Sequence, residues 1–201
     1  MNAVTLDLPG FGVSPPPDGP WGAREFAAAV APVLDDIGEP VVVLGFSFGG
    51  RVAVHLAAAY PERVRALVLT GVPLLRRTGK RNASIAFRLL KRGNKLGIIS
   101  DQRMEAERSK RGSPDYRRAS GVMRDVLVRA VNESYEDELP RVRCKVELVW
   151  GELDTAAPLW VAETAHARLP DSHLTVVPGR THFLPEEEPE QIRAAIKRCL
   201  A

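Results

Sequence analysis

The chain has 201 residues, of which 45% are hydrophobic and 26% are charged. This excludes a disordered chain and suits one globular domain of ordinary size. The formal net charge of +3 is too small to indicate nucleic-acid binding by itself. Neither a signal peptide nor an apolar run of about 18 residues is visible, so we expect a cytoplasmic protein without a membrane span. Two cysteines, Cys144 and Cys199, predict free thiols or one bridge, because a disulfide framework or four-ligand zinc site needs more.

Short apolar runs alternate with amphipathic helical patterns along the chain. The predicted strands, in chain order, are Ala3–Leu8, Pro40–Gly45, Val64–Leu69, Val142–Trp150 and His173–Val177. The predicted helices are Ala23–Ile37, Ser47–Tyr60, Pro158–Leu169 and Glu188–Leu200. Strands that alternate with helices predict an α/β fold, with a mostly parallel sheet of about five strands flanked by helices.

One long segment interrupts this alternation. Residues 74–139 contain no convincing strand, and their pattern predicts helices over Ser84–Arg92, Asp101–Arg111 and Tyr116–Asn132. Basic residues outnumber acidic ones there, which is more typical of a solvated helical face than of an anion-binding surface. We therefore expect one core formed by residues 1–73 and 140–201, with residues 74–139 inserted as a helical cap.

A possible nucleophile stands between a predicted strand and a predicted helix. The sequence Gly45-Phe46-Ser47-Phe48-Gly49 has the G-x-S-x-G pattern, which presents a serine on a sharp strand-to-helix turn. Small residues at positions 45 and 49 let the backbone segments pass closely. The backbone N–H of Phe48 would then lie beside a developing oxyanion. An alternative interpretation of Ser47, taken alone, is an ordinary helix N-cap.

A serine nucleophile needs a base, and the base needs an orienting carboxylate. Asp154 follows the predicted strand Val142–Trp150, and His182 follows the strand His173–Val177. Carboxyl ends of parallel strands meet at one edge of a sheet, so Ser47, Asp154 and His182 are expected together. Glu152 competes with Asp154 for the acid role, but we favour Asp154.

These motifs resemble those of the α/β-hydrolase superfamily. Leu6-Asp7-Leu8-Pro9-Gly10-Phe11-Gly12 is similar to the loop after the family's fourth strand, and the segment around Ser47 to its nucleophile elbow. Gly151-Glu152-Leu153-Asp154 and Gly179-Arg180-Thr181-His182-Phe183 are similar to its acid and histidine loops. The spacing before Pro158 is what favours Asp154 over Glu152. The resemblance implies a serine hydrolase that cleaves a carboxylic ester or related small-molecule acyl substrate through an acyl-enzyme, without cofactor or metal.

The chain also departs from that family. The family's first three strands precede the loop that begins here at Asp7, and the third is followed by a loop that usually supplies a second oxyanion donor. Without those strands, we predict that Ala3–Leu8 pairs directly with the strand Val41–Leu44. The sequence is either a fragment or a genuinely short protein with impaired activity, and we favour the fragment.

Several alternatives follow from this departure. The chain is either an active esterase or a non-catalytic member that binds another molecule in its groove. A perhydrolase or a C–C bond hydrolase would use the same three residues. Phe46 and Phe48 are candidates both for an apolar acyl pocket and for core packing. An exposed sheet edge would favour a homodimer.

Overall fold

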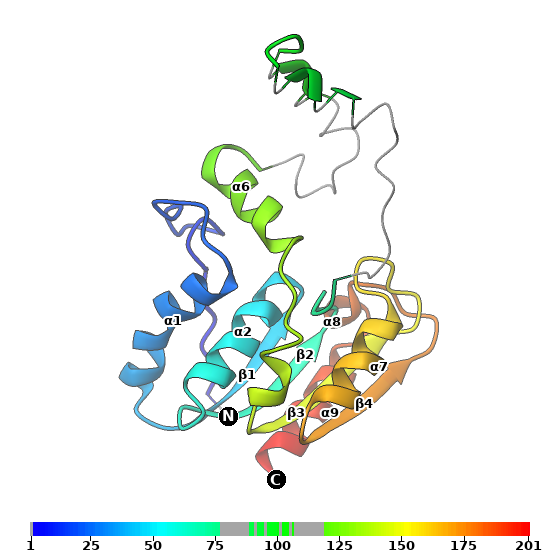
Figure 1. The fold of residues 1–201 in the computed structure, drawn as a ribbon. Coiled ribbons are helices and arrows are strands. Elements are labelled where there is room, and N and C mark those ends of the chain that lie inside the picture. Colours follow the sequence, from blue (N-terminus) through cyan, green and yellow to red (C-terminus); the bar gives the residue numbers. More distant parts are fainter. Residues whose placement is uncertain are drawn as a thin grey trace.

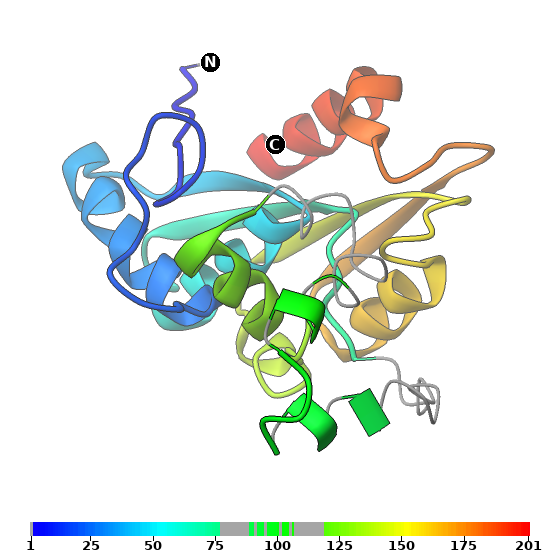
Figure 2. The same cartoon turned by 90° about the horizontal axis from the view of Figure 1, so that it is seen from above.

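A computed structural model of the chain describes residues 2–76, 89–90, 92–94, 96–100, 102–104, 106 and 119–201. These residues form three layers, with helices on both faces of a parallel sheet (Figures 1 and 2). The strands are β1 (Val41–Phe46), β2 (Val64–Thr70), β3 (Lys145–Gly151) and β4 (Ser172–Val177). They lie in the order β1-β2-β3-β4, and all neighbouring pairs are parallel. The α/β fold class with a parallel sheet is therefore confirmed.

The helices follow the predicted amphipathic patterns closely. They are α1 (Ala23–Ile37), α2 (Phe48–Ala59), α6 (Gly121–Ala130), α7 (Leu159–Arg168), α8 (Leu184–Glu187), α9 (Pro189–Leu200) and the 3-10 turn η1 (Leu139–Arg141). Helix α1 ends where the sequence predicted, because Gly38 adopts a left-handed conformation with φ of 75° and its N–H donates to the Leu34 carbonyl. No helix among the described residues combines the length and apolar character needed to cross a bilayer.

Two hydrophobic clusters occupy the two faces of the sheet. Helices α1, α2 and α7 cover one face, where Leu67, Leu148 and Trp150 are fully buried. Helix α9 covers the other face, where Ile192 and Ala195 pack against the side chains of β2 and β3. Figure 2 shows α9 on the opposite side of the sheet from α1 and α7. Burial on both faces explains why β2 and β3 are almost continuously apolar.

The prediction of a strand over Ala3–Leu8, paired directly with β1, is wrong. Residues 2–8 have no strand pairing, and β1 pairs only with β2 among the described residues. The polar groups of Asp7 instead hold a turn: its carboxylate accepts a hydrogen bond from the Val13 N–H, and its carbonyl accepts one from Ser14 Oγ. An extended segment becomes a strand only when a neighbour satisfies its backbone groups, and this one has no such neighbour.

Only part of the expected cap at 74–139 is described. The predicted helices Ser84–Arg92 and Asp101–Arg111 lie largely outside the described residues. The third predicted helix contains α6, which is shorter than expected. Val126 of α6, and Tyr135 and Leu139 after it, belong to the same buried cluster as α1 and α2. The segment that returns to β3 is thus packed on the helical layer.

Candidate active site

Ser47 occupies a strained position between β1 and α2. Its φ of 48° and ψ of −115° make it the one non-glycine residue with positive φ among those described. Such a conformation is costly for a residue with a Cβ and persists only where the surroundings enforce it. Strand pairing supplies part of that enforcement, because the Ser47 N–H donates to the Thr70 carbonyl at the end of β2, 3.1 Å away.

Two glycines make room for this turn. Gly45 was predicted to do so, whereas the second is Gly50 and not the predicted Gly49. A Cβ on Gly45 would come within 2.5 Å of the Gly50 Cα atom, and a Cβ on Gly50 within 2.2 Å of Val72 Cγ2. A Cβ on Gly49 would meet no atom within 4 Å. Close packing therefore requires glycine at positions 45 and 50, whereas the motif residue Gly49 has open space around it.

The structure brings Ser47, His182 and Asp154 into one hydrogen-bonded chain. His182 Nε2 lies 3.2 Å from Ser47 Oγ, and His182 Nδ1 lies 2.8 Å from Asp154 Oδ2. The Asp154 side chain is 1% exposed and that of His182 is 18% exposed. An ionised carboxylate only accepts hydrogen bonds, so the proton resides on Nδ1 and Nε2 is free to accept from the Ser47 hydroxyl.

The acid loop holds the Asp154 carboxylate from the other side. Its Oδ1 atom accepts hydrogen bonds from the N–H groups of Ala156 and Ala157, both at 2.8 Å. Trp150 Nε1 donates to the Ala157 carbonyl at 2.7 Å, which fixes the same loop to β3. Glu152, the rival acid, instead accepts a hydrogen bond from the Gly179 N–H at 2.9 Å. Of the two carboxylates, Asp154 is the one that contacts His182.

The histidine loop is fastened on both sides of His182. The Leu153 N–H donates to the Arg180 carbonyl at 2.8 Å, and the Thr181 N–H donates to Glu187 Oε2 of α8 at 2.9 Å. The histidine loop can approach the acid loop this closely only because residue 151 is glycine. A Cβ there would lie 2.3 Å from the Thr181 carbonyl oxygen. These contacts fix the backbone from which His182 reaches Ser47.

Gly71, which sequence reasoning did not single out, borders the imidazole. It follows β2 with a φ of +58°, and a Cβ there would lie 2.9 Å from His182 Nδ1 and 3.2 Å from a ring carbon of Phe46. The available signal was its position, since a glycine directly after a parallel strand lies at the edge where Ser47 was expected. Gly71 therefore leaves the space that the His182 ring occupies.

Phe46 and Phe48 have different surroundings. The ring of Phe46 lies 5.0 Å from that of His182, centroid to centroid. The ring of Phe48 stacks on Phe11 at 5.4 Å and meets Phe26 edge-on at 5.1 Å. Phe48 thus packs among other aromatic rings, while Phe46 borders the site. As the first residue of α2, Phe48 has a backbone N–H without an intrahelical partner.

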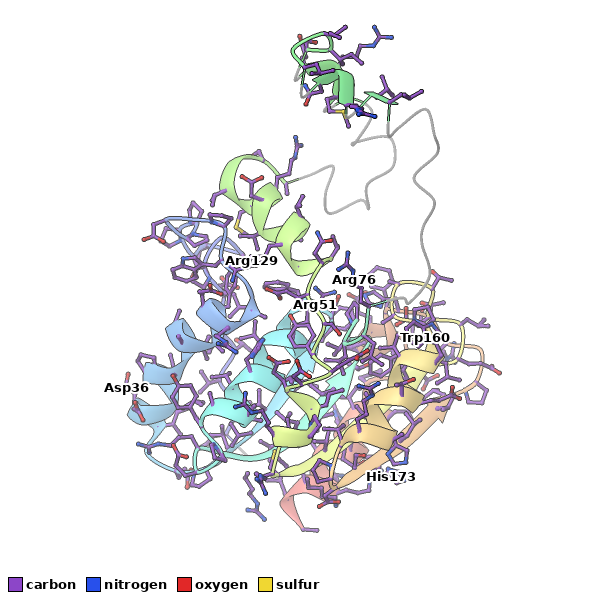
Figure 3. The ribbon with its side chains drawn as sticks, viewed as in Figure 1. Asp36, Arg51, Arg76, Arg129, Trp160 and His173 are labelled. Carbon is purple, nitrogen blue, oxygen red and sulfur yellow. The ribbon has the colours of Figure 1, made fainter. Side chains whose placement is uncertain are left out.

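Arg51, a feature that sequence reasoning missed, lies one helical turn after Ser47. It is 6% exposed and donates a hydrogen bond to the carbonyl of Ala130 at the end of α6. Figure 3 shows it on α2 below α6, with Arg129 near the start of α1. Arg129 pairs with Glu25 of α1 at 2.7 Å. These two arginines connect α6 to α2 and α1.

The remaining histidines lie elsewhere. His166 contacts Ser172 Oγ, and His173 contacts Glu147, both away from Ser47. Within the described ranges, no three His, Cys, Asp or Glu side chains are grouped as around a metal ion. Cys144 and Cys199 are free thiols, and burial raises the pKa of Cys144 to about 11.

Comparison with known proteins places the chain in a family. Residues 2–195 match the model of the alpha/beta hydrolase family. The chain belongs to that family. Over 204 aligned residues it is 29% identical to a pimeloyl-[acyl-carrier protein] methyl ester esterase of Neisseria meningitidis serogroup B, covering 88% of this chain and 74% of that protein.

Two further comparisons differ in extent. Lipase LipV of Mycobacterium tuberculosis is 55% identical over 64 residues, which cover 31% of this chain and 24% of the lipase. That match spans about a quarter of the lipase. The solved structure of a thermophilic esterase from Thermogutta terrifontis has a TM-score of 0.65 at 24% identity, covering 96% of this chain and 77% of the esterase. At that identity the likeness concerns the fold.

Proposed function

We propose that this protein is a serine hydrolase that cleaves a carboxylic ester or related acyl substrate. The supporting observation is the chain of contacts from Asp154 through His182 to Ser47, with Ser47 at a positive φ. Membership in the alpha/beta hydrolase family agrees with it, as do the names of its relatives, which include a lipase and a methyl ester esterase.

The proposed reaction has two steps. His182 Nε2 takes the proton of Ser47 Oγ as that oxygen attacks the acyl carbon, and then gives the proton to the leaving alcohol. Asp154 keeps the imidazole in the required tautomer and stabilises its protonated form. Water then attacks the acyl-enzyme with His182 acting as base, which releases the carboxylic acid and restores Ser47.

The developing negative charge needs hydrogen-bond donors that are already in place. The Phe48 N–H at the start of α2 is the donor that we assign, and the positive end of the α2 dipole points in the same direction. Phe46 borders the imidazole and is the candidate for contact with the acyl group. We propose that residues 74–139 act as a cap that restricts the substrate.

The nucleophile is tested with a fluorophosphonate probe and a p-nitrophenyl ester. We expect the probe to label Ser47, and Ser47→Ala to abolish labelling and lower kcat by at least about 10⁴-fold. Ser172→Ala, at a serine on β4 that bonds to His166, is the matched control and should keep both. Labelling of Ser47→Ala would contradict the assignment.

The alternative is a non-catalytic or impaired member that binds its ligand without turnover. Folded wild-type protein that neither hydrolyses a panel of esters nor reacts with the probe would favour this alternative. Turnover of peroxide or a carbon–carbon bond in place of esters would favour a perhydrolase or a C–C hydrolase with the same three residues.

We also propose that two copies associate through the edge of β1. Among the described residues this strand pairs on one side only, it contains no charged residue or proline, and Leu44 is 46% exposed. Such an edge readily pairs with another strand. Light scattering should give the mass of a dimer, which Leu44→Lys converts to a monomer. Val13→Lys, at a loop residue 95% exposed, should leave the dimer intact, and a monomeric wild type would refute the proposal.

A further inference from the structure

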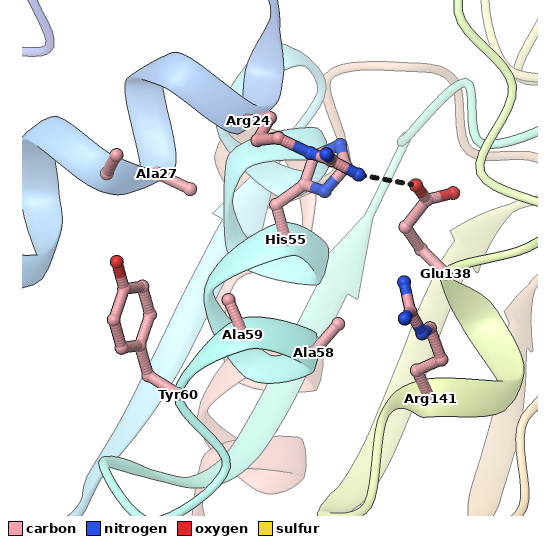
Figure 4. Close-up of a pocket in the computed structure, with 9 residues that line it drawn as sticks. Arg24, Ala27, His55, Ala58, Ala59, Tyr60, Glu138 and Arg141 are labelled. Atoms are coloured by element: carbon pink, nitrogen blue, oxygen red, sulfur yellow. Dashed lines mark ion pairs between the residues drawn. The ribbon is translucent and has the colours of Figure 1, made fainter.

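A cavity lies on the helical layer, and its lining does not include Ser47, His182 or Asp154. It measures about 380 Å³, near the lower end of the range for small-molecule sites. Figure 4 shows side chains from α1, α2 and the segment around η1 converging on it. Four alanines contribute apolar surface, namely Ala27, Ala28, Ala58 and Ala59, and the polar lining residues are Arg24, His55, Tyr60, Glu138 and Arg141. His55 lies eight residues beyond Ser47 on α2, about 12 Å along the helix.

Three of the polar side chains around this cavity have no hydrogen-bond or ion-pair partner within the described part of the chain, although the His55 ring meets the ring of Tyr135 edge-on at 5.2 Å. Among the residues that the structure describes, no hydrogen bond or ion pair involves the imidazole of His55, the hydroxyl of Tyr60 or the guanidinium of Arg141. Arg24, in contrast, lies 3.8 Å from Glu138 (dashed line in Figure 4). A cavity with several convergent polar groups beside an apolar surface is the usual form of a ligand site.

The charges of the side chains that line the cavity indicate which kind of ligand would fit it. Glu138 offsets Arg24, which leaves the single positive charge of Arg141. Burial lowers the pKa of His55, so its imidazole is neutral at physiological pH and offers a hydrogen bond without a charge. One unpaired cation matches a monoanion better than a dianion, which would also be repelled by the nearby carboxylate of Glu138. The alanines would receive an apolar body.

We propose that this cavity binds a small organic acid that carries one carboxylate and a compact apolar body. The carboxylate pairs with Arg141, and His55 and Tyr60 supply hydrogen bonds. The apolar body lies against the alanines of α1 and α2. This site is separate from the one around Ser47, and it does not depend on whether that site hydrolyses esters.

Benzoate is a suitable probe, and the four histidines of the chain provide the readout. In the full chain labelled at histidine, the His55 ring signals report this cavity, whereas those of His182 report the candidate active site. We expect benzoate to shift the His55 signals in a saturable manner, and inorganic phosphate to bind more weakly. No shift at His55, or shifts at His182 alone, would overturn the proposal.

Three variants separate binding from a general change in structure. Arg141→Ala should weaken benzoate binding about tenfold or more, as expected for a lost charge-assisted hydrogen bond. Ala58→Leu should block binding by filling the cavity without changing its charge. Arg193→Ala, at an exposed arginine of α9 that pairs with Glu190, should bind like the wild type. Unchanged signals of His166 and His173 show that each variant is folded, and undiminished affinity in a folded Arg141→Ala would refute the site.

Discussion

At the scale of single residues, the geometry around Ser47 depends on positions where a side chain is absent. Gly45 and Gly50 allow the strand and helix to meet, and Gly71 leaves room for the His182 imidazole. The sequence indicated the motif residues because their spacing is characteristic. It did not indicate Gly71, because the collision that a side chain would cause there involves a residue more than a hundred positions later.

Gly71→Ala should reduce activity more than stability. The new Cβ would lie 2.9 Å from His182 Nδ1 and force the imidazole to move. Displacements of about 1 Å at a reacting group can cost about 10²-fold in rate, so we expect kcat of ester hydrolysis to fall about 10- to 100-fold.

Gly38→Ala is the matched control for this prediction. Gly38 has a similar φ of +75°, and a Cβ there would meet no atom within 4 Å. Both variants should lose about 1 kcal/mol of unfolding free energy from backbone strain, measured by urea denaturation, whereas Gly38→Ala should retain full activity. Equal activity in the two variants would show that Gly71 has no part in placing His182.

At the scale of secondary-structure elements, β3, β4 and α9 meet at a buried carboxylate. Glu147 of β3 is 1% exposed and accepts hydrogen bonds from Arg198 Nε and Nη2 of α9, at 2.9 and 2.7 Å. His173 of β4 lies 3.1 Å from it. Burial alone would raise the pKa of Glu147, but the bonds from Arg198 and His173 outweigh it and hold this pKa below its ordinary value. The strand pattern gave no sign of this cluster.

Because the pKa of Glu147 is lowered in the folded protein, the free energy of unfolding should depend on pH in the acidic range. Because the pKa of Glu147 is lower in the folded than in the unfolded state, where it is about 4.3, its contribution is fully present at neutral pH. This contribution to stability is lost as the pH falls below the unfolded-state pKa of Glu147 and passes through its lower folded-state pKa. We expect the unfolding free energy of the wild type to decline over this range in chemical denaturation.

Glu147→Gln removes the titrating group and tests its contribution. At pH 7 this variant should be less stable by about 3 kcal/mol, the lower end for breaking a buried ion pair, since Arg198 is 39% exposed and retains contact with water. Its stability should change less on acidification than that of the wild type. Glu190→Gln, at an exposed residue of α9, should follow the wild-type curve; the same behaviour in Glu147→Gln would contradict the prediction.

At the scale of the whole molecule, the parallel sheet brings together residues that are distant in sequence. Ser47 and His182 are separated by 135 positions, yet both follow strands whose carboxyl ends lie at the same edge. This convergence was predictable, because parallel order fixes where the loops emerge. The unpaired edge of β1 was not predicted in this form, since Ala3–Leu8 was expected to cover it. Apolar character alone does not give a segment a pairing partner.

The sequence by itself determined the parallel α/β architecture, the bounds of α1 and the choice of Ser47, Asp154 and His182 as candidates. Periodicity and strand–turn–helix spacing are local properties, and the order of the three loops follows from the topology. Only the tertiary structure decided which acid contacts His182, which glycines are sterically required, which groups Arg51 and Glu147 contact, and that a cavity lies beside His55. Those features depend on distances between elements, which no local pattern of residues encodes.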